Sequence, residues 1–136
     1  MDFMKSMAIA ASGLRAQAGR MRIISENIAN ADSTPGAPGS NPYRRKVPTF
    51  QSEFDRALEA RVVEMGKVGT DNSEFRLKYE PGHPAADVNG NVKYPNVNSL
   101  VEMTDMREAQ RSYEANVNVI SATRRMLQRT IDILKA

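Results

Sequence analysis

Apolar residues recur at alternating spacings of three and four near both ends of the chain. Such spacing keeps one stripe of a helix facing a partner along a gentle supercoil. The first stripe, called the N-terminal seam, consists of Phe3, Met7, Ala10, Leu14, Gln17, Met21, Ile24, Ile28 and Ala31. The second, the C-terminal seam, consists of Met103, Met106, Gln110, Tyr113, Val117, Ile120, Arg124, Leu127, Ile131 and Leu134. The pattern predicts two long helices, over residues 2–30 and 99–135, that pack against neighbours along their length.

Local signals mark the ends of these helices. Asp2 is placed to cap the first helix, which ends in a run of helix breakers after Asn30. Ser99 and Glu102 fit a capping box, in which the serine accepts a backbone N–H and the glutamate reaches back. The second helix would be about 55 Å long. That length is more than one small domain can bury.

The N-terminal seam is thin, and Gly13 and Gly19 each cost about 1 kcal/mol relative to alanine in an isolated helix. Because helices gain most of their stability from packing, we expect this helix to need neighbours. Three polar seam members, Gln17, Gln110 and Arg124, are candidates for contacts between subunits, with simple solvent exposure as the alternative.

The middle segment, residues 35–98, has a different composition. It contains all seven prolines and six of the eight glycines. Residues 49–60 have some helical spacing, whereas residues 61–65 and 74–79 are typical of short strands. Asn89-Gly90 is a hairpin signal that would join residues 87–88 to residues 91–94. We expect a small, loop-rich β element here.

These predictions give a mainly α fold. Long N- and C-terminal helices form a coiled-coil-like pair, and a small loop-rich β insert lies between them. The expected division is residues 1–34, residues 35–98 and residues 99–136.

Charge and composition exclude several classes of protein. Nineteen basic and sixteen acidic residues give a net charge of +3 without any concentrated basic region, which argues against nucleic-acid binding. The basic cluster Arg44-Arg45-Lys46 is more typical of a solvated loop or a local acidic contact. Cysteine is absent, so disulfides and thiolate chemistry are excluded. No stretch approaches the roughly twenty apolar residues of a membrane span.

Residues 7–14 have some likeness to the apolar core of a secretory signal. However, alanine dominates this stretch, and the seven-residue repeat runs through the supposed cleavage box. If the protein leaves the cytoplasm, we expect a route without a cleaved signal peptide.

Catalysis has little support in the sequence. His83 is the sole histidine, and its candidate carboxylate partners, Asp71 and Asp87, lie in loop-rich sequence without a familiar ligand spacing. His83 precedes a proline and is more typical of a turn. We expect no enzyme activity, no metal and no cofactor.

Several short motifs follow one another in a specific order. They are Ser12-Gly13-Leu14; Ser25-Glu26 before Asn27, Ile28, Ala29, Asn30 and Ala31; Thr34; Tyr43-Arg44-Arg45-Lys46 leading into Phe50; residues 83–87; residues 94–98; Glu102-Met103; and residues 111–117. The first three resemble the N-terminal signature shared by axial proteins of the bacterial flagellum. The others look like the short proximal rod proteins of the FlgC type, and the resemblance covers the whole chain.

This resemblance implies a structural subunit of the flagellar basal-body rod. Members of the family assemble helically with further copies and sister rod proteins, near the membrane ring, and transmit torque across the periplasm. They are exported through the flagellar type III apparatus. Their terminal helices form an inner tube, while the middle segment lies outside. The site residues it implies are the two assembly seams and the motif Asn27, Ile28, Ala29, Asn30 and Thr34.

The chain departs from the family pattern at two places. The stretch from residue 33 to residue 41 is richer in proline and glycine, and Asn91 stands where an aromatic residue often follows the glycine. The alternative is a cytoplasmic coiled-coil adaptor that dimerises through both seams. That alternative explains the repeats but not the insert or the ordered motifs.

Overall fold

The computed structural model describes residues 2–136, which form two long helices and six short strands. The elements are α1 (Phe3–Ala29), β1 (Lys46–Val47), β2 (Phe50–Asp55), β3 (Ala60–Met65), β4 (Gly69–Thr70), β5 (Arg76–Tyr79), β6 (Asn91–Tyr94) and α2 (Ser99–Lys135). Helices account for 47% of the chain and strands for 18%. The two terminal helices and the strand insert are therefore as predicted, but the insert holds more strand than a mainly α description conveys.

Each strand pairs with one antiparallel partner: β1 with β4, β2 with β3, and β5 with β6. The helical spacing noted for residues 49–60 was misleading, because β2 and a turn occupy this segment. Phe50 and Phe54 lie four residues apart, a spacing that also places both on one face of a strand. Asp55 then accepts hydrogen bonds from the N–H groups of Ala57 and Leu58, which closes the turn.

The Asn89-Gly90 turn forms as predicted, but it does not join the predicted strands. Gly90 has a φ of 82°, and its N–H donates to Asp87. However, β6 pairs with β5, so the connection between the two strands comprises residues 80–90. A turn signal is local, whereas the choice of partner strand depends on residues outside it.

The helix starts differ in how well the sequence predicted them. Asp2 caps α1, because its carboxylate accepts a hydrogen bond from Met4 N–H at 2.9 Å. The capping box predicted for α2 is wrong: Asn98, not Ser99, accepts from the first N–H groups, at 3.1 Å from Leu100 N. Glu102 makes a different contact, described below. No helix among residues 2–136 is long and apolar enough to cross a membrane.

The chain divides into two compact units. The first unit combines the described residues up to Met21 with residues 49–67 and 107–136, and the second combines residues 22–48 with 68–106. Each long helix therefore contributes one segment to each unit.

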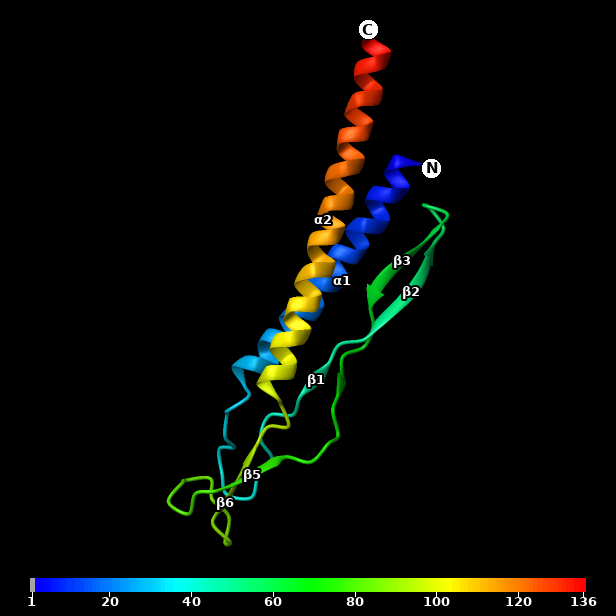
Figure 1. The fold of residues 1–136 in the computed structure, drawn as a ribbon. Coiled ribbons are helices and arrows are strands. Elements are labelled where there is room, and N and C mark those ends of the chain that lie inside the picture. Colours follow the sequence, from blue (N-terminus) through cyan, green and yellow to red (C-terminus); the bar gives the residue numbers. More distant parts are fainter. Residues whose placement is uncertain (1) are drawn as a thin grey trace. The chain divides into compact units, whose positions relative to one another are not determined.

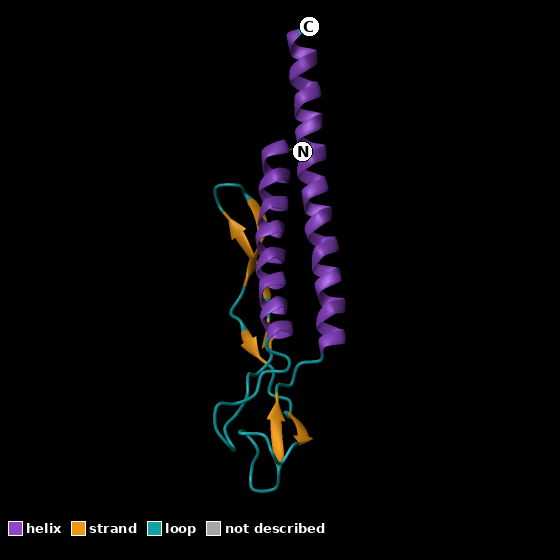
Figure 2. Cartoon of the chain, turned by 90° about the vertical axis from the view of Figure 1, so that its left-hand side faces the viewer, coloured by secondary structure: helices purple, strands orange, loops and turns teal. Residues whose placement is uncertain are grey.

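In the first unit, α1 lies between the β2–β3 hairpin and α2 (Figure 1), an order that Figure 2 shows again after a quarter turn. Val63 N–H donates to Ser12 Oγ at 3.2 Å and ties β3 to α1. A Cβ added at Gly19 would lie 2.2 Å from Met65 Sδ, and one at Gly13 would lie 2.8 Å from the Asn116 side chain of α2. Both helix-weakening glycines thus permit close approach of a neighbouring element.

The buried apolar residues are few and mostly small. They are Ala10, Ala16, Ile23, Ile24, Ala31, Ala85, Val92, Val97 and Ala109. Small side chains bury little apolar area, so they contribute little hydrophobic free energy. Polar contacts must therefore provide much of what fixes this fold.

Candidate functional site

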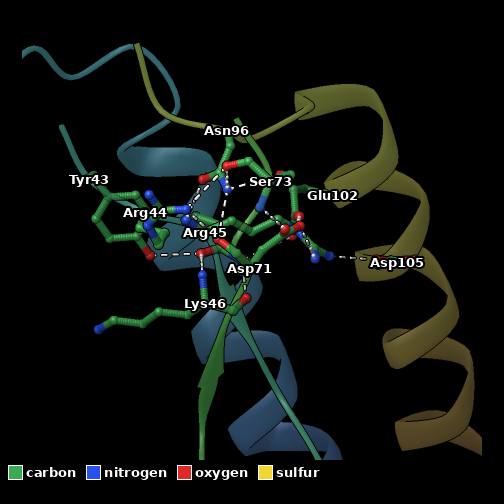
Figure 3. Close-up of polar contacts among 10 residues, drawn as sticks. Tyr43, Arg44, Arg45, Lys46, Asp71, Ser73, Asn96, Glu102 and Asp105 are labelled. Carbon is green, nitrogen blue, oxygen red and sulfur yellow. Dashed lines mark hydrogen bonds and ion pairs between the residues drawn. The ribbon is translucent and has the colours of Figure 1, made fainter. Parts of the chain in front are cut away.

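The second unit contains a cluster of polar side chains from segments far apart in the sequence. Ten residues form this group, which we call the polar cluster: Asn27, Tyr43, Arg44, Arg45, Lys46, Asp71, Ser73, Asn96, Glu102 and Asp105. Figure 3 shows side chains from the loop before β1, the loop after β4 and the first turns of α2 converging on one region. Four of the motifs that carry the family resemblance, at residues 25–31, 43–46, 94–98 and 102–103, therefore meet in space.

Asn27, in the last turns of α1, is fully buried and uses its amide completely. Its Nδ2 donates to Lys46 O at 2.9 Å and to a Glu102 carboxylate oxygen at 3.3 Å. Its Oδ1 accepts from Lys46 N–H at 3.0 Å and from Tyr43 OH at 2.7 Å. One side chain thus fixes the path of the strand that enters the insert.

Glu102 is also fully buried and forms an ion pair with Arg45. A buried carboxylate is tolerated only when its charge is paired and hydrogen-bonded. Arg45 also lies 3.6 Å from Asp71 and 3.8 Å from Asp105. Burial alone would lower the pKa of Arg45, but the hydrogen bond and charge of Glu102, together with the charges of Asp71 and Asp105, outweigh burial and raise the pKa above its ordinary value.

The loop after β4 is held by its backbone carbonyls. Arg44 donates to the carbonyls of Asp71 at 2.9 Å and Ser73 at 3.1 Å, and its guanidinium lies 4.3 Å from the centre of the Phe75 ring. Asn96 Nδ2 donates to the same Asp71 carbonyl, while its Oδ1 accepts from Arg45 N–H. The basic cluster is thus the local acidic and carbonyl contact that the sequence allowed, not a solvated loop.

At the more exposed side of the cluster, Lys46 and Glu26 form an ion pair at 2.9 Å. The hydrogen bond and charge of Lys46 lower the pKa of Glu26, and Glu26 in turn raises the pKa of Lys46. Burial raises the pKa of the Tyr43 phenol, which stays protonated and available as a donor to Asn27.

A second contact ties the end of α1 to the β5–β6 pair. Arg76 donates to Ala31 O at 2.8 Å and Pro95 O at 3.1 Å, and it lies 3.6 Å from an Asp32 carboxylate oxygen. Its guanidinium also lies 5.9 Å from the centre of the Tyr94 ring. The family motifs at the end of α1 and before α2 are therefore joined through one arginine.

The polar cluster and Arg76 stabilise the fold and are not arranged for catalysis. The carboxylates and amides of the cluster are paired with one another, which leaves no side chain poised to transfer a proton. No three His, Cys, Asp or Glu side chains among residues 2–136 are placed to hold a metal ion. His83 lies in a turn, as predicted, and its Nδ1 accepts a hydrogen bond from Ala85 N–H at 3.0 Å.

The predicted family-motif residues differ in their burial and in the contacts that they make. Asn27 belongs to the polar cluster, and Asn30 donates to Glu26 O at 2.8 Å at the end of α1. Ile28 is half-buried, whereas Ala29 and Thr34 are exposed. The two asparagine amides thus both satisfy backbone groups, although they reach different segments.

The N-terminal seam has no fully exposed member. Ala10, Ile24 and Ala31 are buried, and the half-buried members are Phe3, Met7, Leu14, Gln17, Met21 and Ile28. The Gln17 side-chain oxygen is buried without a hydrogen-bond partner among the described residues.

The C-terminal seam is half-buried at alternate members only. Met106, Tyr113, Ile120 and Leu127 are half-buried, whereas the exposed members are Met103, Gln110, Val117, Arg124, Ile131 and Leu134. The less exposed positions between them are one residue earlier: Glu102, Ala109, Asn116 and Thr123. The face of α2 that the rest of the chain covers is therefore rotated from the predicted stripe, and the other predicted members are exposed in the chain.

The sequence did not predict the Arg45–Glu102 pair. Glu102 was assigned to a local cap, and Arg45 was considered only as part of a basic cluster. A signal was present, because a local acidic contact was one of the two interpretations of the cluster Arg44-Arg45-Lys46.

Comparison with known proteins shows which family the chain belongs to. The family described as "Flagella basal body rod protein" matches residues 7–37, and the family described as "Flagellar basal body rod FlgEFG protein C-terminal" matches residues 88–133. A flagellar basal-body rod protein FlgC from Agrobacterium fabrum is 57% identical over 94% of this chain and 92% of its own length. The chain belongs to the FlgC family of flagellar basal-body rod proteins.

More distant FlgC proteins match over nearly the same length. The protein from Bacillus subtilis is 38% identical over 96% of this chain and 97% of its own length, and the one from Salmonella typhimurium is 39% identical over 92% of each. The chain is thus a structural rod subunit of the flagellar basal body and not an enzyme.

Proposed function

We propose that this FlgC-family subunit transmits torque across the periplasm by packing helically against sister rod proteins and further copies of itself. The observation that carries the proposal is the row of exposed apolar side chains on α2, including Val117, Ile131 and Leu134. A soluble monomer gains nothing from exposing such a row. Helices of neighbouring subunits would cover it and complete a coiled coil with the N- and C-terminal seams.

The proposal also covers the position of the subunit in the rod and the route by which the chain is exported. The subunit would lie near the membrane ring at the base of the rod, and it would reach the periplasm through the flagellar type III apparatus without a cleaved signal peptide. The small apolar core supports this route, because a chain with little hydrophobic stabilisation is readily kept unfolded for passage through a narrow channel. The division into two axial helices (residues 1–34 and 99–136) and an outer insert (residues 35–98) belongs to the same proposal.

The test is a substitution at an exposed seam position. Val117→Asp places a charge on the proposed interface, and we expect the variant to fold with an unchanged circular dichroism spectrum but to be absent from purified basal bodies. Asn118→Asp, at the next exposed position, is the matched control and should incorporate normally. Normal motility with Val117→Asp would reject the seam. A substitution at a buried seam position, such as Ile24→Asp, would not test the interface, because it would also disrupt packing within the chain.

A deletion strain tests the function as a whole. Electron cryotomography of cells lacking the gene should show a membrane ring without a rod beyond it, and a complementing copy should restore the rod. Complete rods in the deletion strain would refute the proposed function.

A further inference from the structure

One face of the β2–β3 hairpin is acidic and has no cation. Side chains alternate along a strand, and directly paired residues share a face. The pairings Gln51–Glu64, Glu53–Val62 and Asp55–Ala60 therefore place three carboxylates on one face, which we call the acidic hairpin face: Glu53, Asp55 and Glu64. None of them forms an ion pair among the described residues.

Two of these carboxylates are close enough to disturb each other. Hydrogen bonding to Glu64, together with its charge, raises the pKa of Glu53 above its ordinary value. Like charges across a strand pair destabilise the pair. Arg15 of α1 lines the same hollow as Glu64, but it forms no ion pair with any of the three carboxylates among the described residues.

The last third of α2 carries the opposite charge. Arg124, Arg125 and Arg129 are exposed, and no acidic residue lies between Glu114 and Asp132. None of the three arginines forms an ion pair among residues 2–136. A hollow of about 370 Å³, which we call the basic α2 groove, is lined by Ser121, Arg124, Arg125 and Gln128.

The hairpin and the last third of α2 belong to the same unit, on different sides of α1. Both views place α1 between the hairpin and α2 (Figures 1 and 2). Their charges are complementary, and none of these groups forms an ion pair among residues 2–136, so a second copy can offer each surface a partner of opposite charge.

We propose that the acidic hairpin face of one copy docks on the basic α2 groove of a second copy. Alternate residues of a strand lie about 7 Å apart, and residues four apart on a helix about 6 Å, so Glu53 and Asp55 can together reach Arg125 in the groove and Arg129, one turn further along α2. Arginine binds carboxylates through paired hydrogen bonds, which also fixes orientation. Since the two surfaces differ, the contact is heterologous and can repeat from copy to copy. The inference rests on the proposed rod function and names one of its interfaces.

Cysteine cross-linking tests the contact directly, because the natural chain has no cysteine. Gln51→Cys stands on the acidic hairpin face, and Gln128→Cys lines the groove without removing a charge. The two variants are expressed together with tags of different size, and isolated basal bodies are oxidised. We expect a disulfide-linked pair of the two sizes. Ser52→Cys, on the opposite face of the same strand, is the control and should give at least about tenfold less product.

Charge reversal gives a second, independent measurement. Glu53→Arg with Glu64→Arg should reduce incorporation into basal bodies about tenfold, as should Arg125→Glu with Arg129→Glu. All four substitutions in one chain should restore it. A Glu53→Gln, Glu64→Gln chain separates folding from docking, because it should melt at a higher temperature than the wild type and still incorporate less.

The outcomes distinguish this interface from the rod function. If the wild-type chain is incorporated and both charge-reversed chains are incorporated just as fully, the proposed interface is wrong but the rod function stands. A Gln51→Cys product formed only with a different rod protein would overturn the assignment to a second copy. Absence of the wild-type chain from basal bodies would instead refute the rod function itself.

Discussion

Asn27→Ala is the substitution whose cost the structure defines best. The side chain is fully buried and makes four hydrogen bonds, two of them to the backbone of Lys46. At about 1 kcal/mol net for each bond, their loss costs about 4 kcal/mol, of which the better helix propensity of alanine offsets about 0.5 kcal/mol. That is a large fraction of the roughly 5–15 kcal/mol that stabilises a typical domain.

The matched control is Asn30→Ala, which removes a single hydrogen bond from the same motif. Urea unfolding followed by tyrosine fluorescence measures both variants, and three of the four tyrosines lie in the second unit. With an m value of about 2 kcal/mol/M, Asn27→Ala should lower the midpoint by about 1.5–2 M, and Asn30→Ala by under about 0.5 M. Equal midpoints for the two variants would refute the argument that Asn27 organises the polar cluster.

Three further predictions concern single contacts. Because Lys46 lowers the pKa of Glu26, the stability from this ion pair is present above the ordinary glutamate value of 4.5 and is lost as the pH falls through the lower folded value. The difference in urea midpoint between wild type and Lys46→Met should therefore shrink between about pH 6 and about pH 3, and a constant difference would contradict it. Gly90→Ala should cost about 2 kcal/mol in urea unfolding, because φ is 82° there, whereas Gly82→Ala, with open space around it, should cost far less. Gly13→Leu should lower thermal stability by about 1–3 kcal/mol by pushing on the facing side chain of α2, and an unchanged melting curve would show that the helices do not approach there.

The positions of the helices were predictable because both carry a strong repeat. Which face of α2 the rest of the chain covers was only half predictable. Met106 and Tyr113 are half-buried as the stripe requires, but the covered positions that follow each of them are Ala109 and Asn116, which a search for large apolar residues passes over. A small or polar residue leaves little periodic signal, even where a neighbouring element covers it.

The polar cluster was not predictable, although most of its motifs were noticed. Arg45 and Glu102 lie far apart in the sequence, and a local capping role for Glu102 was the simpler interpretation. Asn27 lies near the end of its helix, where sequence alone would assign its amide to backbone groups of that helix end, as it is for Asn30. Contacts between distant segments depend on the path of the loops, and residues 35–45 have no periodicity from which to predict that path.

The long sequence separations within the polar cluster also set the order in which the protein can acquire its shape. Asn27 must wait for Glu102, which is synthesised 75 residues later, and Arg45 must wait for the same residue. Pairings between distant segments form slowly, because loop closure is costly before any contact rewards it. At a synthesis rate of about 5–20 residues per second, the nascent chain spends several seconds without the partner that locks the end of α1. During that interval the end of α1 lacks the contact that joins it to α2, so the fold of the second unit is completed only after nearly the whole chain has been made.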